Sequence, residues 1–280
     1  MDKNKYLKTN KLFSIAVFVL ALAMMAFIFY RFFPPLENDW MRFYSKLTAN
    51  LSYPNHVPGY VNPPWAALLV PYGLLPIRIS NVINLLLNIA VLFFAIRKVN
   101  GGWLGILLTF TSPLFFDLAR VNPIDWIPLL GFLLPTAWGL PLMAIKPQTL
   151  GASMLIKWKN ENYKIKPLIP LIVVVILSFL VWGFWINKEA VSFTNKPWNF
   201  SFWPLSIPLG IYVLYKAWKE GDELLTGAST ALLVPYIAPY SIACIISILS
   251  GKYKKIAIAL YLISWWYVMV EGRRLGLIMF

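Results

Sequence analysis

The sequence predicts an all-α protein of the polytopic membrane class, and three observations carry that prediction. Hydrophobic residues make up 59% of the 280-residue chain and charged residues only 13%, which is more apolar surface than a soluble fold can bury. Long apolar runs suit helices that cross a bilayer, and short basic loops separate them. No repeat or separate polar domain interrupts residues 1–280. We expect a single integral membrane domain: a transmembrane helical bundle with juxtamembrane helices at its outer face and some broken or re-entrant helices.

The first span is expected at residues 12–30. Four lysines precede it, and the run is long enough to cross a hydrocarbon core of about 30 Å. It is too long for a signal-peptide core and lacks a small-residue cleavage site, so we expect it to be retained. Because positive charge is favoured on the inner side, the N-terminus is predicted to be cytoplasmic and the chain to cross the cell (inner) membrane several times.

Residues 31–78 are expected to stay outside, because they are too polar and too rich in proline to form a span. Within residues 38–50, apolar side chains recur at the i, i+3, i+4, i+7 spacing of one helix face. This stripe consists of Trp40, Phe43, Tyr44 and Leu47. It predicts a helix lying flat on the bilayer. Residues 65–77 are apolar but broken by two prolines, and are expected to lie along the outer leaflet or dip into it.

The next apolar runs are expected to cross inward at 79–96 and outward at 103–118. Four prolines break residues 124–156, and several lysines follow. One short span plus a re-entrant hairpin would bring the chain inside by residue 157, with its irregular backbone buried in protein or lining a cavity.

The C-terminal half is expected to alternate in the same way. Residues 167–186 cross outward, 187–202 form an outer loop, 203–218 return and 256–271 form the last span. Between these, residues 224–235 and 238–250 form either a short hairpin broken at two prolines or one kinked span.

The net charge of +14 favours membrane lipids as partners. The basic residues cluster in loops between spans, which is the positive-inside bias together with attraction to anionic lipid. No nucleic-acid partner is expected. The single cysteine, Cys244, cannot form an internal disulfide and is expected to be a small buried side chain.

Asp39 is the main candidate for catalysis. It stands just beyond the first span, at the start of the predicted outer helix and close to Glu37. That position puts a carboxylate near lipid head groups. The plain alternative is a helix cap or a solvated loop acid.

Lys146 is the second candidate. Apolar residues flank it on both sides, and a charged lysine at bilayer depth normally faces a cavity or an anion. The alternative is a lysine that reaches back to the interface.

Several further polar residues are expected at the outer face. Arg42, Arg78 and Arg120 suit a pocket for a phosphate, although each alone could be a surface arginine. Arg120, Asn122 and Asp125 form a polar group where one span ends and the next begins.

No metal or cofactor site is expected. His56 is the only histidine, and no second histidine, cysteine or acid stands at ligand spacing, so we interpret it as a loop residue near substrate. The motifs of nucleotide, zinc and nucleophile sites are missing from the sequence.

Four stretches in this order resemble the GT-C class of glycosyltransferases, closest to the bacterial polyprenol-phosphate-mannose-dependent mannosyltransferases. The stretches are Asp39-Trp-Met-Arg-Phe-Tyr, Tyr60-Val-Asn-Pro-Pro-Trp continuing to Pro76, Gly139-Leu-Pro-Leu-Met-Ala-Ile-Lys-Pro147, and Leu233-Val-Pro-Tyr-Ile-Ala-Pro-Tyr240. The chain departs from the family at Ala119-Arg-Val-Asn122, where the family has Gly-Gln-x-Asn, and it is shorter than typical members.

The resemblance implies a mechanism. Asp39 would deprotonate an acceptor hydroxyl at the outer face, and that oxygen would attack the anomeric carbon of a sugar on polyprenyl phosphate, with inversion. Lys146 and outer arginines would stabilise the phosphate leaving group. Glu37, His56, Tyr60 and Asn122 are expected to line the substrate site. The implied partners are a polyprenyl-phosphate-linked sugar, such as mannose or another hexose or pentose, and a glycan, lipid or protein acceptor.

Two other functions stay open at this point. A catalytically inactive homologue would bind lipid-linked glycans or act in assembly. A small lipid or solute transporter would use the broken regions 124–156 and 224–250 as discontinuous helices, although the two halves show no matching repeat.

Overall fold

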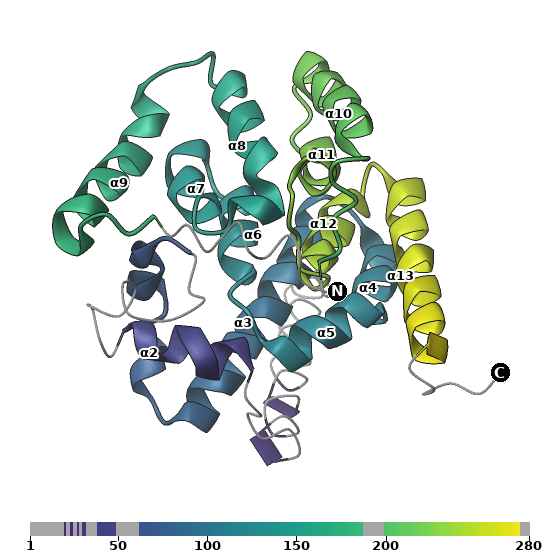
Figure 1. The fold of residues 1–280 in the computed structure, drawn as a ribbon, viewed down its shortest axis with the longest axis horizontal. Coiled ribbons are helices and arrows are strands. Elements are labelled where there is room, and N and C mark those ends of the chain that lie inside the picture. Colours follow the sequence, from purple (N-terminus) through teal and green to yellow (C-terminus); the bar gives the residue numbers. More distant parts are fainter. Residues whose placement is uncertain are drawn as a thin grey trace, which may run out of the picture.

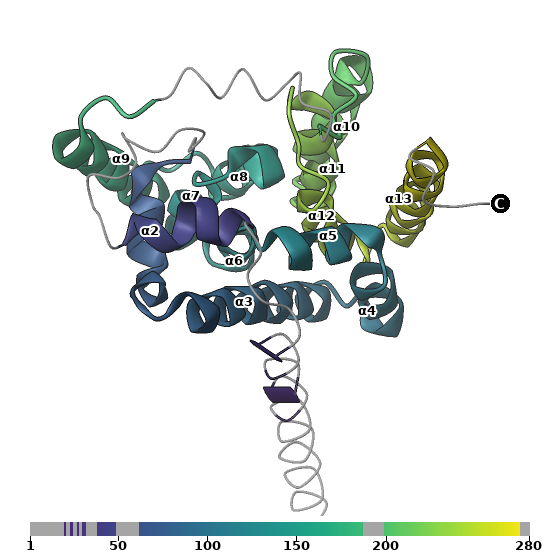
Figure 2. The same cartoon turned by 60° about the horizontal axis from the view of Figure 1, so that its bottom comes forward.

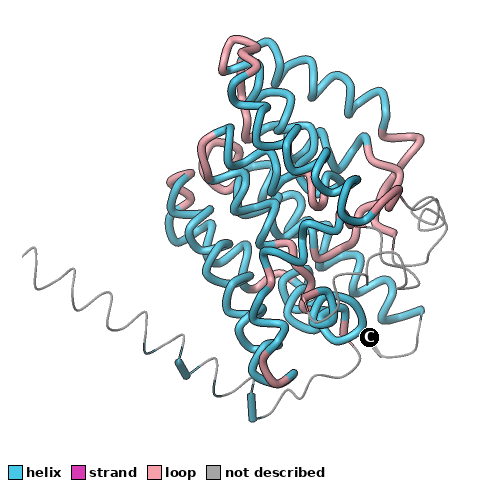
Figure 3. Tube along the Cα trace, turned by 90° about the vertical axis from the view of Figure 1, so that its left-hand side faces the viewer, coloured by secondary structure: helices cyan, strands magenta, loops and turns pink. Residues whose placement is uncertain are grey.

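The computed structural model describes residues 38–48, 62–186 and 199–274, with a few isolated positions between residues 20 and 31. All the regular secondary structure of this part of the chain is helical, which confirms the all-α prediction (Figure 1, Figure 3). The expected first span falls mostly outside the described residues. So do three predicted site residues, Glu37, His56 and Tyr60.

The first described segment packs against the protein. A π-helical turn, η1 (Trp40–Tyr44), runs directly into α2 (Ser45–Leu47). Trp40 and Leu47 are 0% exposed, so the prediction that this stripe faces the bilayer is wrong. The reason is that protein contacts take up the apolar face: the Trp40 ring stacks on Tyr72 at 4.9 Å between centroids, and its indole N–H donates to Ser80 Oγ at 3.0 Å.

Two 3-10 helices connect this segment to the longest helix. They are η3 (Pro64–Leu69) and η4 (Pro71–Leu74), and α3 (Ile77–Lys98) follows. The 22 residues of α3 extend over roughly 33 Å. Among the described residues, α3 alone is long and apolar enough to cross a membrane by itself.

The outward crossing predicted at 103–118 is broken. The structure has α4 (Gly102–Phe110) and α5 (Pro113–Val121), which meet at 58° and pass the length test for a span only as a pair. The break has a local cause: the Ser112 side chain accepts from the Phe115 N–H at 3.1 Å and Pro113 occupies the first helical position, so a new helix begins there. The crossing itself stays a prediction, and the structure shows that the run at 103–118 is two helices rather than one.

The proline-rich region 124–156 consists of three short helices, α6 (Trp126–Leu133), α7 (Thr136–Met143) and α8 (Pro147–Asn160). α6 and α7 pack closely where Gly131 meets Gly139. A Cβ atom on Gly131 would lie 2.6 Å from the Gly139 carbonyl oxygen, so only glycine permits this approach. The region is thus divided into short helices, as its prolines indicate, and a short span plus a re-entrant hairpin stays a prediction.

Five helices complete the chain: α9 (Ile169–Trp182), α10 (Ile207–Glu220), α11 (Leu225–Leu233), α12 (Ser241–Leu249) and α13 (Lys254–Arg274). α11 and α12 are antiparallel, because Gly227 near the start of α11 lies against Ile248 near the end of α12. The hairpin, rather than one kinked span, is thus the arrangement at 224–250. α12 is buried along its whole length, whereas α9 and α13 lie at opposite edges (Figure 2).

The polar contacts between helix ends fall into two groups. At one end, here called the lysine end, Lys157 pairs with Glu223 at 3.3 Å and Lys252 pairs with Asp222. The Lys98 ammonium donates to the Leu133 carbonyl in the same group. At the other end, here called the Asp39 end, Tyr240 bonds Asp39. The rings of Trp65 and Trp185 also meet there, at 5.6 Å. α3 extends from one end to the other. Asn81 near its start bonds Asn38 at the Asp39 end, and its last residue, Lys98, lies at the lysine end.

Candidate functional site

Three asparagines on α3, here called the asparagine ladder, hold the chain reversal at Asn122 by hydrogen bonds. They are Asn81, Asn84 and Asn88. Asn122 Nδ2 donates to the carbonyl and the side-chain oxygen of Asn81, both at 2.8 Å. Asn84 Nδ2 donates to Asn122 Oδ1 at 2.8 Å and to the Pro123 carbonyl at 3.0 Å. Asn122 has a φ of 49°, a left-handed conformation that asparagine tolerates better than most residues. The prediction that Asn122 lines the substrate site is wrong, because its buried amide is occupied by the hydrogen bonds that shape this turn.

The same ladder positions two acids. Asn88 accepts from the Trp126 N–H at 3.1 Å, which fixes the start of α6 and therefore Asp125 just before it. On the other side, Asn38 Nδ2 donates to Asn81 Oδ1 at 2.9 Å, which fixes the start of η1 and therefore Asp39. Two acids distant in sequence are thus placed by one helix.

Replacing Asn84 by leucine is expected to destabilise the protein by about 2–4 kcal/mol, because unsatisfied buried groups cost about 1–3 kcal/mol each. The change keeps the side-chain volume but leaves the Trp126 indole N–H (3.0 Å) and the Tyr72 hydroxyl (2.8 Å) without their acceptor. Thermal unfolding of the purified protein, followed by tryptophan fluorescence, measures this. Ile79→Ala, on an exposed position of the same helix, is the control, and equal melting of the two variants would contradict the structural role.

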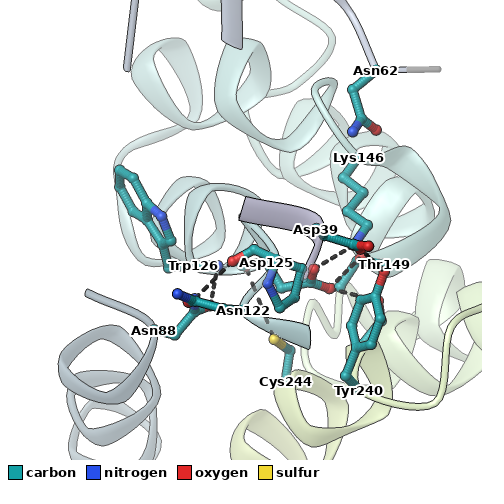
Figure 4. A network of polar contacts seen from close by, with 12 residues as sticks. Asp39, Asn62, Asn88, Asn122, Asp125, Trp126, Lys146, Thr149, Tyr240 and Cys244 are labelled. Carbon is teal, nitrogen blue, oxygen red and sulfur yellow. Dashed lines mark hydrogen bonds and ion pairs between the residues drawn. The ribbon is translucent and has the colours of Figure 1, made fainter. Parts of the chain in front are cut away.

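Asp125 and Lys146 form a buried ion pair at the centre of the site (Figure 4). Their side chains are 0% and 3% exposed. Ser241 donates to Asp125 Oδ1 at 2.5 Å, and Thr149 donates to the same oxygen at 3.4 Å. These bonds satisfy a carboxylate that burial would otherwise penalise heavily. The pair lies where α6, α8 and α12 begin.

Asp39 lies beside this pair. The Tyr240 hydroxyl donates to Asp39 Oδ2 at 3.2 Å, and the Lys146 ammonium lies 4.5 Å from the centre of the Tyr240 ring. Figure 4 shows Asp39, Lys146, Thr149 and Tyr240 converging. Burial raises the pKa of Asp39 above its ordinary value; the Lys146 charge and the Tyr240 hydrogen bond oppose that rise, and the Asp125 charge adds to it. A carboxylate tuned in this way is a better proton acceptor than a solvated one.

The structure changes the roles of the predicted cations. Lys146 does contact an anion, but this anion is the protein's own Asp125 carboxylate. Arg120 pairs with Asp117 at 2.7 Å on its own helix, and its side chain is 77% exposed, so it turns away from the site. Arg78 is exposed at the start of α3. Arg42 is exposed too, and its charge acts on Asp39.

Sequence reasoning missed several residues of this site. Tyr240, Ser241 and Thr149 are uncharged, and nothing in their local sequence marks them as site residues. The asparagines of α3 carried a detectable signal, because three amides at i, i+3 and i+7 in an apolar helix need partners. Asp125 stands out in the sequence as part of a polar group, but its pairing with Lys146, twenty-one residues away, gives no local signal.

Neither a metal-binding cluster among the described residues nor a match to a known protein assigns a function to this site. In the described part of the chain, no three His, Cys, Asp or Glu side chains gather closely enough to hold a metal ion. A scan against protein-family models finds no match, and searches of curated proteins and of solved structures find no significant match either.

Proposed function

We propose that this protein is a membrane glycosyltransferase of the GT-C type, which moves a sugar from polyprenyl phosphate to an acceptor hydroxyl with Asp39 as the general base. The observation that carries the proposal is the Asp39 carboxylate, partly buried and held between Tyr240 and Lys146. A base next to a buried cation matches the chemistry that the four resembling stretches imply.

The exposed surface supports a membrane location. Large apolar side chains cover the outward faces of α9, α10 and α13. They include Ile172, Ile176, Leu180, Leu209, Ile211, Leu262, Ile263 and Met269, each 46% exposed or more. Soluble monomers rarely expose so many large apolar side chains along helix faces, and lipid would cover them.

The two ends of the bundle support the proposed topology. Segments predicted inside from their lysines contact one another at the lysine end, through Lys157, Asp222 and Lys252. Segments predicted outside meet at the Asp39 end. The inside and outside assignments made from the basic loops thus agree with which segments contact one another in the structure.

The proposed reaction needs only one proton acceptor. Asp39 takes the proton of the acceptor hydroxyl as its oxygen attacks the anomeric carbon, and the carbon–phosphate oxygen bond breaks with inversion. The phosphate leaves as an anion and needs little acid assistance. Arg42, exposed one helical turn from Asp39, is the cation best placed to meet it. Lys146 contributes its charge from within the protein, next to the base.

The function is tested with purified protein in lipid nanodiscs and radiolabelled polyprenyl-phosphate mannose, glucose or arabinose. A membrane extract supplies acceptors. We expect one of these donors to be consumed, with release of polyprenyl phosphate and label passing to an acceptor. Consumption no faster than in empty nanodiscs, for all three donors, would count against a glycosyltransferase.

The topology is tested by single cysteines in a Cys244→Ala background. An impermeant maleimide applied to intact cells is expected to label a cysteine at position 78 and to spare one at position 164, both exposed in the structure. Permeabilised cells should show both labelled. The reverse pattern would place Asp39 in the cytoplasm and rule out the proposed outer site.

A transporter is a second candidate, favoured by one observation. The Asp125–Lys146 pair lies at breaks between short helices, where carriers place ion and substrate sites. Proteoliposomes holding a pH-sensitive dye distinguish the two functions. Proton movement that follows added solute, together with a lack of donor consumption, would favour the carrier.

A further inference from the structure

Tyr240 contacts two of the three charged side chains of the site, Asp39 and Lys146, with one side chain. Its hydroxyl donates to Asp39 Oδ2 at 3.2 Å, and the face of its ring lies 4.5 Å from the Lys146 ammonium. A tyrosine ring attracts a cation through its negative face, whereas its hydroxyl donates to an anion. Tyr240 therefore satisfies the two opposite charges by two different parts of its structure.

Ser241, the residue after Tyr240, holds the other acid of the site, Asp125. Ser241 donates to Asp125 at 2.5 Å, and Asp125 pairs with Lys146. Two consecutive residues at the start of α12 thus contact both acids. Because α12 is buried along its whole length, this end of the helix is a rigid support for the contacts.

We infer that Tyr240 is a positioning residue that orients the Asp39 carboxylate, holds it ionised and sets its separation from Lys146. The inference deepens the proposed function and rests on Asp39 being the base of that reaction. Tyr240 itself exchanges no proton in this scheme. Its role is to keep the carboxylate aimed and charged until an acceptor hydroxyl arrives.

The charges around Asp39 determine how its protonation changes when the Tyr240 hydroxyl is removed. Asp39 faces Lys146 at the start of α8, Asp125 before α6 and Arg42 on its own helix. The α3 groups packed against this segment are the neutral side chains of Ser80 and Asn81. Lys146 and the Tyr240 hydroxyl favour the ionised form of Asp39, and Asp125 disfavours it. Removing the hydroxyl therefore shifts the balance toward the protonated acid.

The test uses dicyclohexylcarbodiimide, which modifies protonated carboxyl groups, over a range of pH. Mass spectrometry follows labelling of the Asp39 peptide in the intact protein in nanodiscs, and Asp39→Asn defines the background. In Tyr240→Phe the midpoint of labelling is expected to move to higher pH by about one unit, the size of one hydrogen bond to a charged group. The acidic limb of the pH–rate profile for sugar transfer should move in the same direction.

A second tyrosine gives a matched control. The Tyr253 hydroxyl donates to the Asp222 carboxylate at 2.7 Å at the lysine end, so Tyr253→Phe removes the same kind of bond elsewhere. It should leave the Asp39 midpoint unchanged. Should Tyr240→Phe misfold, difluorotyrosine introduced at position 240 keeps the shape and makes the hydroxyl a stronger donor, which moves the midpoint to lower pH.

The outcomes separate this inference from the proposed function, because labelling needs no sugar donor. An unmoved midpoint in a folded Tyr240→Phe protein, or in the difluorotyrosine protein, overturns the positioning role even if sugar transfer is observed. A moved midpoint without consumption of any donor leaves the Tyr240 contact standing and overturns the glycosyltransferase.

Discussion

Replacing Lys146 by methionine is expected to destabilise the protein by about 3–5 kcal/mol, because it leaves the buried Asp125 carboxylate without its counter-ion. Asp125 is 0% exposed and cannot recover solvation from water. A lysine that served only to bind the phosphate of the donor could be replaced with little effect on folding, but the buried pair with Asp125 makes Lys146 necessary for stability. Thermal unfolding of the purified variant measures the loss.

Two further variants make this prediction specific. Adding Asp125→Asn to Lys146→Met removes the unpaired charge while keeping an acceptor for Ser241, and should restore most of the lost stability. Lys157→Met breaks an ion pair at the lysine end whose partner Glu223 is 30% exposed, so it should cost much less. Unfolding of Lys146→Met at the wild-type temperature would contradict the pairing.

Replacing Asp39 by asparagine is expected to lower sugar transfer by about 10²–10⁴-fold, the range for loss of a general base. Asparagine keeps the shape and can still accept the Tyr240 hydrogen bond, so the change removes little beyond the proton acceptor. Initial rates with the donor that the wild-type protein consumes are the measurement. Glu37→Gln, which neutralises the nearest other acid in the sequence, should have a much smaller effect.

The same variant has an expected effect on stability, with a sign fixed by the raised pKa of Asp39. A carboxyl group whose pKa is raised on folding binds its proton more tightly in the native state, so it contributes stability that is lost as pH rises above its ordinary value of about 3.9. Asparagine has no ionisable proton, so the Asp39→Asn variant does not lose stability in this way as the pH rises. It should melt at a higher temperature than wild type at pH 7 and near the wild-type temperature at pH 4; lower stability at pH 7 would contradict the burial of the charge.

Local patterns in the sequence predicted the helices well, and the reasons are physical. The apolar run at 79–96 is long and lacks proline, so α3 follows from its composition. The break between α11 and α12 follows from the prolines between them, whereas the choice between a hairpin and a kinked span does not. Ser112 and Pro113 are a standard helix start, and the bend between α4 and α5 was readable from them although it was not predicted.

The site was only half predictable, because its groups meet through tertiary packing. Asp39 and Lys146 stood out as charges in apolar surroundings, which is a local property. That Lys146 pairs with Asp125, and that Tyr240 bridges Lys146 and Asp39, depends on four helix starts meeting in space. Likewise the stripe from Trp40 to Leu47 indicated an amphipathic helix correctly, but periodicity cannot distinguish a face covered by lipid from one covered by protein.

The most direct test is a cryo-electron microscopy map of the protein in nanodiscs with added polyprenyl phosphate. We expect tube-like density for the lipid at the protein surface, with the phosphate group at the Asp39 end, next to Asp39 and Arg42. A phosphate group bound instead at the lysine end, beside Lys157 and Lys252, would contradict it.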